Sequence, residues 1–344
     1  MHRPPFDVTH VRDATPTDPG RRTPLRALAA LTLAAIAPAS RAQPFPSRPL
    51  KVVVPHAAGG NSDAFGRILA QKLAERIGQP VVVENRTGAG GTIACASIAR
   101  SPADGYQVVV ADTGTHAIAP QLYGTRLQYD VFKDFTPVSL AATFPTVLLL
   151  HPSVPAKTPQ EFVALVKSQP GKLTFSSAGT GNGSHLAQTV FLHAAGGLDM
   201  IHVPYKGGAP AIQALIAGEI QMTAVSVNTS LPHIKSGRAR ALGLASSKRS
   251  PALPDLATLA ESGIVGAEAD NWLAVLAPPG LPPDIAATLT REVNATLLLP
   301  DVKERLAGLG LEVVAAGAQP YNELLKKDVA KWTEAVKRSG AVAE

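Results

Sequence analysis

The sequence has little of what several classes of protein require. It contains one cysteine in 344 residues, so no internal disulfide can hold it together. Aromatic residues make up only 5% of the chain, which leaves few surfaces on which nucleic-acid bases would stack. The net charge is +6, but the basic residues do not gather into runs. We therefore expect no nucleic-acid partner.

Motifs for catalysis, metal binding and membrane spanning are also missing. No G-x-x-x-x-G-K-[ST], G-x-S-x-G, H-x-x-x-H or H-E-x-x-H pattern occurs. Ser184 and His185 are adjacent at a predicted helix start, where neighbouring side chains point in different directions, so they make a poor catalytic pair. Beyond residue 42 no apolar run approaches the length of about 20 residues that spans a bilayer. We therefore expect neither enzymatic activity nor a cofactor or metal.

The N-terminus has the order of an export signal. Arginines within 21–26 precede the apolar stretch 27–39, and Ser40 and Ala42 are the small residues at positions −3 and −1 of a cut after Ala42. The paired arginines also resemble a loose twin-arginine signal, so both the Sec and the twin-arginine route stay open. The polar first 20 residues are unlike a short basic start and suggest an over-extended start. We expect a signal peptide at 1–42 and a periplasmic mature protein.

Short apolar runs alternate with helical patterns along the mature chain, which indicates an α/β fold. The predicted strands are 50–55, 80–84, 107–111, 173–176, 200–203, 220–225 and 239–245. The predicted helices are 62–77, 92–100, 184–195, 209–217 and 231–236. Such alternation favours parallel sheets with helices on both faces. We expect two βα blocks, and hence two α/β lobes.

The C-terminal segment defines the predicted domain organisation. Residues 284–340 are mostly helical in pattern, with one strand at 311–315, and contain too few strands for a sheet of their own. This segment should therefore pack back on the first block, with chain crossings near Pro145 and Asn271. The predicted lobes are 43–144 plus 270–344, and 145–269.

Four strand-to-helix junctions are rich in glycine and small polar residues. They are 56–63, 112–116, 176–185 and 204–208, two in each predicted block. Ligands of parallel sheets bind at the carboxyl ends of strands, where helix N-termini leave amide groups unpaired and favour negative charge. Taken singly, each loop is explained equally well by a tight turn or by a helix cap, such as Ser62 or Ser184. Residue patterns alone therefore leave open whether these loops bind a ligand or only shape the chain.

A set of short motifs runs through the mature chain in a recognisable order. They are Pro46-Ser47-Arg48-Pro49, Gly59-Gly60 with Asp63 and Arg67, Pro80 to Arg86 followed by Gly88-Ala89-Gly90-Gly91, Asp104-Gly105-Tyr106, Gly114-Thr115-His116, His151-Pro152-Ser153-Val154-Pro155, Ser177-Ala178-Gly179 and His202 to Gly207. In these motifs the chain from about Phe45 onward resembles the Bug-type (Bordetella uptake gene) extracytoplasmic receptors of tripartite tricarboxylate transporters.

The resemblance implies a type II periplasmic-binding-protein (Venus flytrap) fold, with two α/β lobes joined by two hinge crossings. It also implies capture of a small carboxylate between the lobes by a monomer and delivery to the membrane permease of a tripartite tricarboxylate transporter. A receptor that feeds a two-component regulator is the alternative function. Because ligand carboxylates in the family lie against the first and third loops, the resemblance implies a site that contains Ala58, Gly59, Ser62, Thr113, Thr115, Thr180, Ser184, His185, Tyr205 and Lys206.

Departures from the family pattern bear on the ligand. His56 stands where the family usually has Phe or Tyr, and Asn61 where it often has Gly. Ser226 and Asn228 lie in a stretch where many relatives have a Phe-Asp-Asn-like loop, so we add these four residues to the predicted site. Val225 stands at the acidic position of that loop, so a ligand ammonium group would lack a carboxylate partner. We therefore expect a di- or tricarboxylate or an aromatic acid rather than an amino acid.

Overall fold

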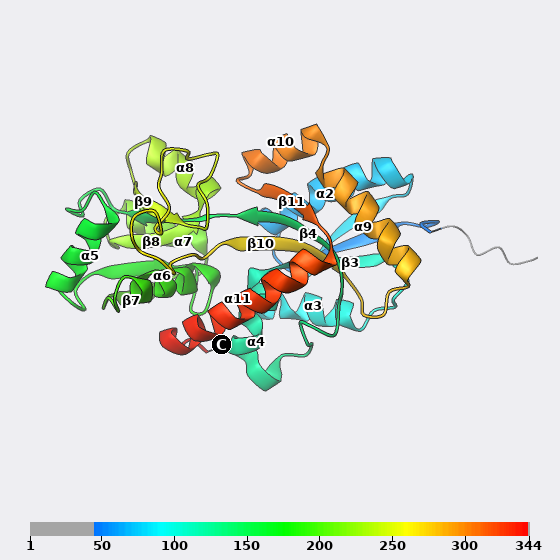
Figure 1. Cartoon of the computed structure of the whole chain (residues 1–344), viewed down its shortest axis with the longest axis horizontal. Helices are drawn as coiled ribbons and strands as arrows, with labels where there is room; N and C mark the ends of the chain where they lie inside the picture. The colour runs from blue at the N-terminus through cyan, green and yellow to red at the C-terminus, as the bar shows by residue number, and fades with distance from the viewer. Residues whose placement is uncertain (1–44, 343–344) are drawn as a thin grey trace, which may run out of the picture. The chain divides into compact units, whose positions relative to one another are not determined.

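The computed structural model describes residues 45–342, whose strands form two sheets (Figure 1). The six-stranded sheet has the order β11-β4-β10-β3-β1-β2 and the five-stranded sheet the order β7-β6-β8-β5-β9. The strands of the first are β1 (Leu50–Val54), β2 (Val81–Asn85), β3 (Gln107–Asp112), β4 (Thr136–Phe144), β10 (Asn271–Ala277) and β11 (Glu312–Ala316). Those of the second are β5 (Thr146–Leu150), β6 (Thr174–Ser177), β7 (Ile201–Pro204), β8 (Met222–Ser226) and β9 (Arg240–Ala245).

The chain crosses between the two sheets twice. Strands β4 and β5 belong to different sheets although only Pro145 separates them, and the chain returns to the first sheet at β10, which starts at Asn271. Hydrogen bonds tie the crossings together: Asn271 Nδ2 donates to Thr146 Oγ1 at 3.0 Å, and Thr146 Oγ1 donates to the carbonyl of Ala269 at 3.2 Å.

Both sheets are mixed, so the prediction of parallel sheets is wrong in part. Strand β1 pairs parallel with β2 and β3, and β6 pairs parallel with β7 and β8. However, β10 runs antiparallel to β3 and β4, and β5 runs antiparallel to β8 and β9. The antiparallel strands β4, β5 and β10 carry the crossings, and β5 and β10 each come directly after another strand rather than a helix, so the βα pattern does not reveal these two. Strand β5 is buried at every position and shows no alternation.

Helices flank both sheets. Those of the first segment and the C-terminal tail are α2 (Asn61–Ile77), α3 (Thr92–Ala99), α4 (Ala119–Tyr123), α9 (Pro283–Leu297), α10 (Pro300–Gly308) and α11 (Ala318–Ser339), with the π-helical turn η3 (Gly114–Ile118) before α4. Those of the middle segment are α5 (Pro159–Ser168), α6 (Gly183–Ala194), α7 (Gly208–Ile216) and α8 (Val227–Lys235). Local sequence sets their ends: Thr158 caps α5 by accepting a hydrogen bond from the amide of Glu161, and Gly78 ends α2 with a left-handed φ of +66°.

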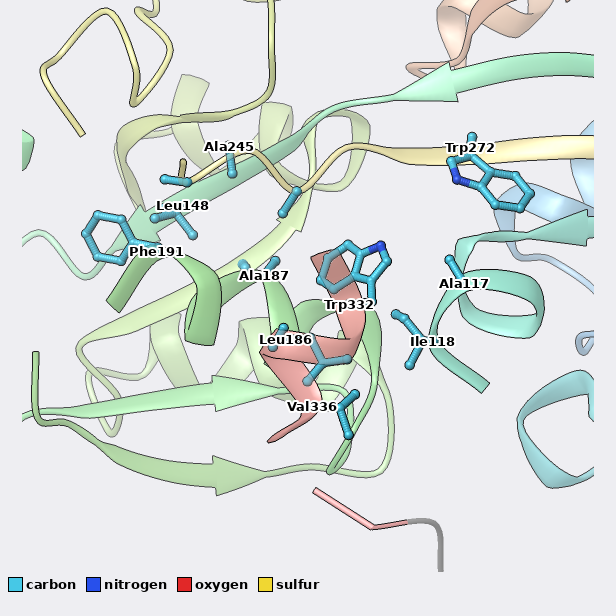
Figure 2. Close-up of a cluster of buried hydrophobic side chains, with 14 of the residues drawn as sticks. Ala117, Ile118, Leu148, Leu186, Ala187, Phe191, Ala245, Trp272, Trp332 and Val336 are labelled. Carbon is cyan, nitrogen blue, oxygen red and sulfur yellow. The ribbon is translucent and has the colours of Figure 1, made fainter. Parts of the chain in front are cut away.

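Helix α11 contributes to a core shared by both sheets. It packs against β4 and η3 of the first part and against α6 of the second. Figure 2 shows its Trp332 and Val336 beside Leu186 and Ala187 of α6, with Ile118 of η3 nearby. A second tie is the indole of Trp272 on β10, which donates to Asp328 Oδ2 of α11 at 2.8 Å. The C-terminal helix therefore holds the six-stranded part and the α6 region together.

Cys95 is free and fully buried on α3, and burial raises the pKa of its thiol, so it has the character of an inert structural thiol. Within residues 45–342, no helix combines the length and the apolar character needed to cross a membrane. The predicted signal peptide lies outside the described residues.

Candidate functional site

A cavity of about 850 Å³ opens among the loops at the ends of strands from both sheets. Its volume lies in the range of pockets that hold small molecules, which is about 300–1,000 Å³. The first sheet and its loops contribute His56, Ala89, Gly90, Asp112, Thr113, Gly114, Ile118, Ala119, Leu122, Tyr123, Phe144 and Asn271. The second contributes Thr146, Ala178 to Ser184, Pro204 to Lys206 and Ala224 to Ser226. The predicted loops thus surround one cavity.

The wall from the first sheet contains an ion pair. His56 follows β1 and Asp112 ends the neighbouring parallel strand β3, so both lie at the same edge of the sheet. Nε2 of His56 is hydrogen-bonded to Oδ2 of Asp112. Burial alone would raise the pKa of the Asp112 carboxyl, but His56 and hydrogen bonds from Thr115 outweigh it and hold that pKa below its usual value. The only acidic side chain among the lining residues is therefore ionised and already paired.

The loop that carries His56 is anchored by a second carboxylate. Asp63, buried at the start of α2, accepts hydrogen bonds from the amide of Gly59 at 2.9 Å, from Arg67 Nε at 3.0 Å and from Asn85 Nδ2 at 2.9 Å. Asn85 Nδ2 also donates to the carbonyl of His56 at 3.0 Å. Although burial opposes it, these bonds lower the pKa of the Asp63 carboxyl. Asp63 does not line the cavity itself. It fixes the position of the loop that carries His56.

Most side chains of the β6–α6 loop serve the loop itself. Ser184 Oγ accepts from the amide of Ala178 at 2.9 Å, and Asn182 Oδ1 accepts from the amide of Ser184 at 2.9 Å. His185 Nδ1 accepts from the amide of Gly181 at 3.1 Å, and burial lowers the pKa of His185 to about 4. Thr180 is different, because its exposed side chain lines the cavity and its hydroxyl has no partner within residues 45–342. This hydroxyl is available to a ligand.

His185 and His202 form a stacked pair behind that loop. Their rings are parallel within 5° with centroids 3.8 Å apart, and Nε2 of His202 lies 2.7 Å from Ser177 Oγ. The neutral state of His185 follows from its lowered pKa and lets the rings stack without repulsion. His202 is therefore a satisfied structural histidine, as its position between two apolar strand residues predicts.

The remaining lining residues provide an apolar wall and a polar floor. Ile118, Leu122, Tyr123, Phe144 and Val225 line the cavity with carbon surface. The floor is formed at the crossings by the hydrogen-bonded pair Thr146 and Asn271. Thr113 is tied to the same place, because its hydroxyl accepts from the amide of Trp272 at 3.0 Å. An anion with an apolar body matches such a lining.

The predicted site residues divide into two groups. Seven of them line the cavity: His56, Thr113, Thr180, Ser184, Tyr205, Lys206 and Ser226. The others, which do not line it, are Ala58, Gly59, Asn61, Ser62, Thr115, His185 and Asn228. Thr115 and His185 are buried, and the Thr115 hydroxyl and His185 Nδ1 are hydrogen-bonded inside the protein. Asn228 packs against Gly310: a Cβ added at Gly310 would lie 2.9 Å from the Cβ of Asn228.

Sequence reasoning missed five polar lining residues, Asp112, Tyr123, Thr146, Asn182 and Asn271. Asp112 was visible as the first residue of a glycine-containing junction. Thr146 and Asn271 lie at the crossings themselves, where the sequence gives no separate loop signal. Among the described residues, no three His, Cys, Asp or Glu side chains converge to hold a metal ion.

A family model described as "Tripartite tricarboxylate transporter family receptor" (TctC) matches residues 65–341. The chain belongs to this family. It is 34% identical to protein BugT of Bordetella pertussis over 90% of this chain and 95% of that protein. Among solved structures, it is similar to R. palustris Rpa4515 with adipate, at 32% identity and a TM-score of 0.76, covering 87% of this chain and 99% of that one. It is also similar to MatC of Rhodopseudomonas palustris with bound malate, at 33% identity and a TM-score of 0.71, covering 85% and 100%.

These likenesses confirm the Bug-type resemblance and the two-lobed α/β fold of periplasmic binding proteins. As a TctC-family receptor, the chain is a solute-binding protein and not an enzyme. Its family fixes the class of the site, while the residues around the cavity must explain which solute it takes.

Proposed function

We propose that this protein is a periplasmic receptor that captures a small organic carboxylate in the cavity between its sheets and delivers it to the permease of a tripartite tricarboxylate transporter. One observation carries the proposal: the cavity combines the basic side chains of His56 and Lys206 with an acid, Asp112, that is already ion-paired. An anion therefore meets no unpaired negative charge there. The relatives solved with adipate and malate support the same ligand class.

The proposal extends to the motion that encloses the ligand. The lobes would be 43–144 plus 270–344 and 145–269, and they would move about the crossings at Pro145 and before Asn271. Because Thr146 and Asn271 lie both at the crossings and in the cavity floor, a bound ligand would contact the hinge directly. The protein would act as a monomer, exported by a signal peptide cleaved after Ala42.

The ligand would be a di- or tricarboxylate or an aromatic acid rather than an amino acid. An ammonium group needs a free carboxylate, and Val225 occupies the position where an acid would supply one. Asp112 does not replace it, since both of its oxygens are engaged by His56 and Thr115. Calorimetry that found tight binding of glutamate or aspartate, with none of simple carboxylates, would contradict this.

Replacing Thr180 by valine should weaken carboxylate binding while leaving the melting temperature unchanged. Hydrogen bonds to a charged group contribute about 1.5–3 kcal/mol each, and the Thr180 hydroxyl makes no bond to the described protein that the substitution would break. Calorimetric titration with a panel of aliphatic and aromatic acids measures the loss. The matched control is Thr125→Val, an exposed threonine outside the cavity lining. Equal affinities of the two variants for every acid that binds the wild type would place the ligand away from Thr180.

A further inference from the structure

His56 is the cavity residue whose hydrogen-bonding capacity changes with its charge. Its Nε2 is committed to Asp112, while 39% of the side chain is exposed and the ring lines the cavity. Its Nδ1 has no partner among residues 45–342. With Nε2–H donating to Asp112, a neutral ring presents a lone pair at Nδ1, whereas a protonated ring presents an N–H donor there. The two states therefore offer opposite groups to a ligand.

The surroundings hold this arrangement in place. The carboxylate of Asp112 is fixed through Oδ1, which accepts from the amide of Thr115 at 2.8 Å and from Thr115 Oγ1 at 3.0 Å. The backbone of His56 is fixed by the bond from Asn85 Nδ2 to its carbonyl. With both partners anchored, Nε2 keeps its N–H and its bond to Asp112. The proton that the ring gains and loses on titration is therefore the one at Nδ1.

The charges near His56 favour its protonated state. Burial lowers the pKa of His56, but the charge of Asp112 and the hydrogen bond to it outweigh burial and raise that pKa above its usual value. The other titratable groups of the cavity lining are Tyr123 of α4 and Tyr205 and Lys206 of the loop after β7. Asp63 of α2, which supports the same loop, is engaged by Arg67, Gly59 and Asn85.

We propose that His56 is a specificity-determining residue that binds an anionic group of the ligand through its Nδ1–H, so that carboxylate binding is coupled to protonation of this ring. A carboxylate has only acceptors, so it pairs with the imidazolium and is disfavoured by the Nδ1 lone pair of the neutral ring. The inference rests on the proposed function and names a residue that discriminates anions from neutral or cationic solutes. The affinity for the carboxylate is then highest at pH values below the pKa that His56 has in the free protein. It falls as the pH rises toward the pKa that the ring has in the complex.

Calorimetry of the mature protein with adipate, malate and benzoate tests this coupling. Titrations in two buffers of different ionisation enthalpy give the number of protons taken up with each acid. For the wild type we expect uptake that grows toward one proton as the pH rises above the pKa of free His56, with a falling affinity. His56→Gln retains an amide donor for Asp112 but cannot titrate, so its proton uptake should vanish. At acidic pH its affinity should fall roughly tenfold to hundredfold, because a charged hydrogen bond is lost.

Lys206→Gln is the matched control. It removes the other basic side chain of the cavity, so it should weaken binding similarly at every pH while leaving proton uptake at the wild-type value. NMR titration of the His56 ring in the free protein supplies a readout without ligand, and Asp112→Asn should lower its pKa.

The outcomes separate the two proposals. Binding of an acid to the wild type without proton uptake, or with the same uptake in His56→Gln, overturns the role of His56 and leaves the receptor function standing. No binding of any of the three acids at any pH overturns the coupling for these carboxylates and counts against the proposed function as well.

Discussion

Alanine at Gly181 is expected to weaken carboxylate binding at least about tenfold, which corresponds to about 1.4 kcal/mol. Gly181 has φ +72°, and a Cβ there would lie 2.9 Å from both Cδ atoms of Leu122. Leu122 belongs to α4, whereas Gly181 belongs to the β6–α6 loop, and both line the cavity. The new methyl group would therefore have to displace the Leu122 side chain, which also lines the cavity.

Gly197→Ala separates this effect from backbone strain. Gly197 has a similar φ of +74° but no atom within 4 Å of an added Cβ, and it lies outside the cavity lining. Both variants should lose about 1–2 kcal/mol of stability, because a residue with a Cβ is disfavoured in the left-handed conformation. Only Gly181→Ala should also lose affinity, and Leu122→Ala in the same chain should restore part of it. Equal affinities of the two alanine variants would show that the Leu122 contact has no part in binding.

Trp332→Ala is expected to lower the free energy of unfolding by about 3–5 kcal/mol, the usual cost of emptying a buried aromatic site. The side chain is 0% exposed and packs from α11 into a cluster that includes residues from η3 and α6 (Figure 2). Its removal empties a space at the place where both sheets contribute to one core. Urea unfolding followed by far-UV circular dichroism measures the loss.

Trp332→Phe is the matched control, because it keeps an aromatic ring in the core. The indole Nε1 of Trp332 has no hydrogen-bond partner among the described residues, so phenylalanine breaks no such bond. We expect it to cost less than half as much as alanine. A loss below about 1 kcal/mol for Trp332→Ala would mean that the core reorganises around the gap and that α11 is not the tie we describe.

The sequence predicts the fold well where a strand leads into a helix. The apolar run at 50–55 and the helical spacing after it match β1 and α2 closely, with Gly78 as the helix end. It fails at β4, β5 and β10: β4 runs into β5 with only Pro145 between them, and β10 comes after the long segment that follows β9, so none of the three begins a regular strand–helix repeat. The place of β10 in its sheet depends on pairs of residues more than 100 positions apart, such as Asn271 with Phe144 of β4. No local pattern contains that information.

For the site, the sequence identifies the loops better than the atoms. The glycine-rich junctions contain His56, Thr180, Tyr205 and Lys206, which the family resemblance placed in the site and which line the cavity. The same signal also selected Thr115, whose hydroxyl turns inward to Asp112. Whether a polar side chain of such a loop faces a ligand or its own backbone depends on side-chain geometry, which residue type and spacing do not fix.

A crystal structure of the mature protein with a bound acid such as adipate would show whether the cavity between the two sheets is the carboxylate site. We expect a carboxylate inside the cavity, with its oxygen atoms within hydrogen-bonding distance of the Thr180 hydroxyl or amide and of His56 or Lys206. A well-ordered acid bound outside this cavity, with the cavity filled only by water, would contradict it.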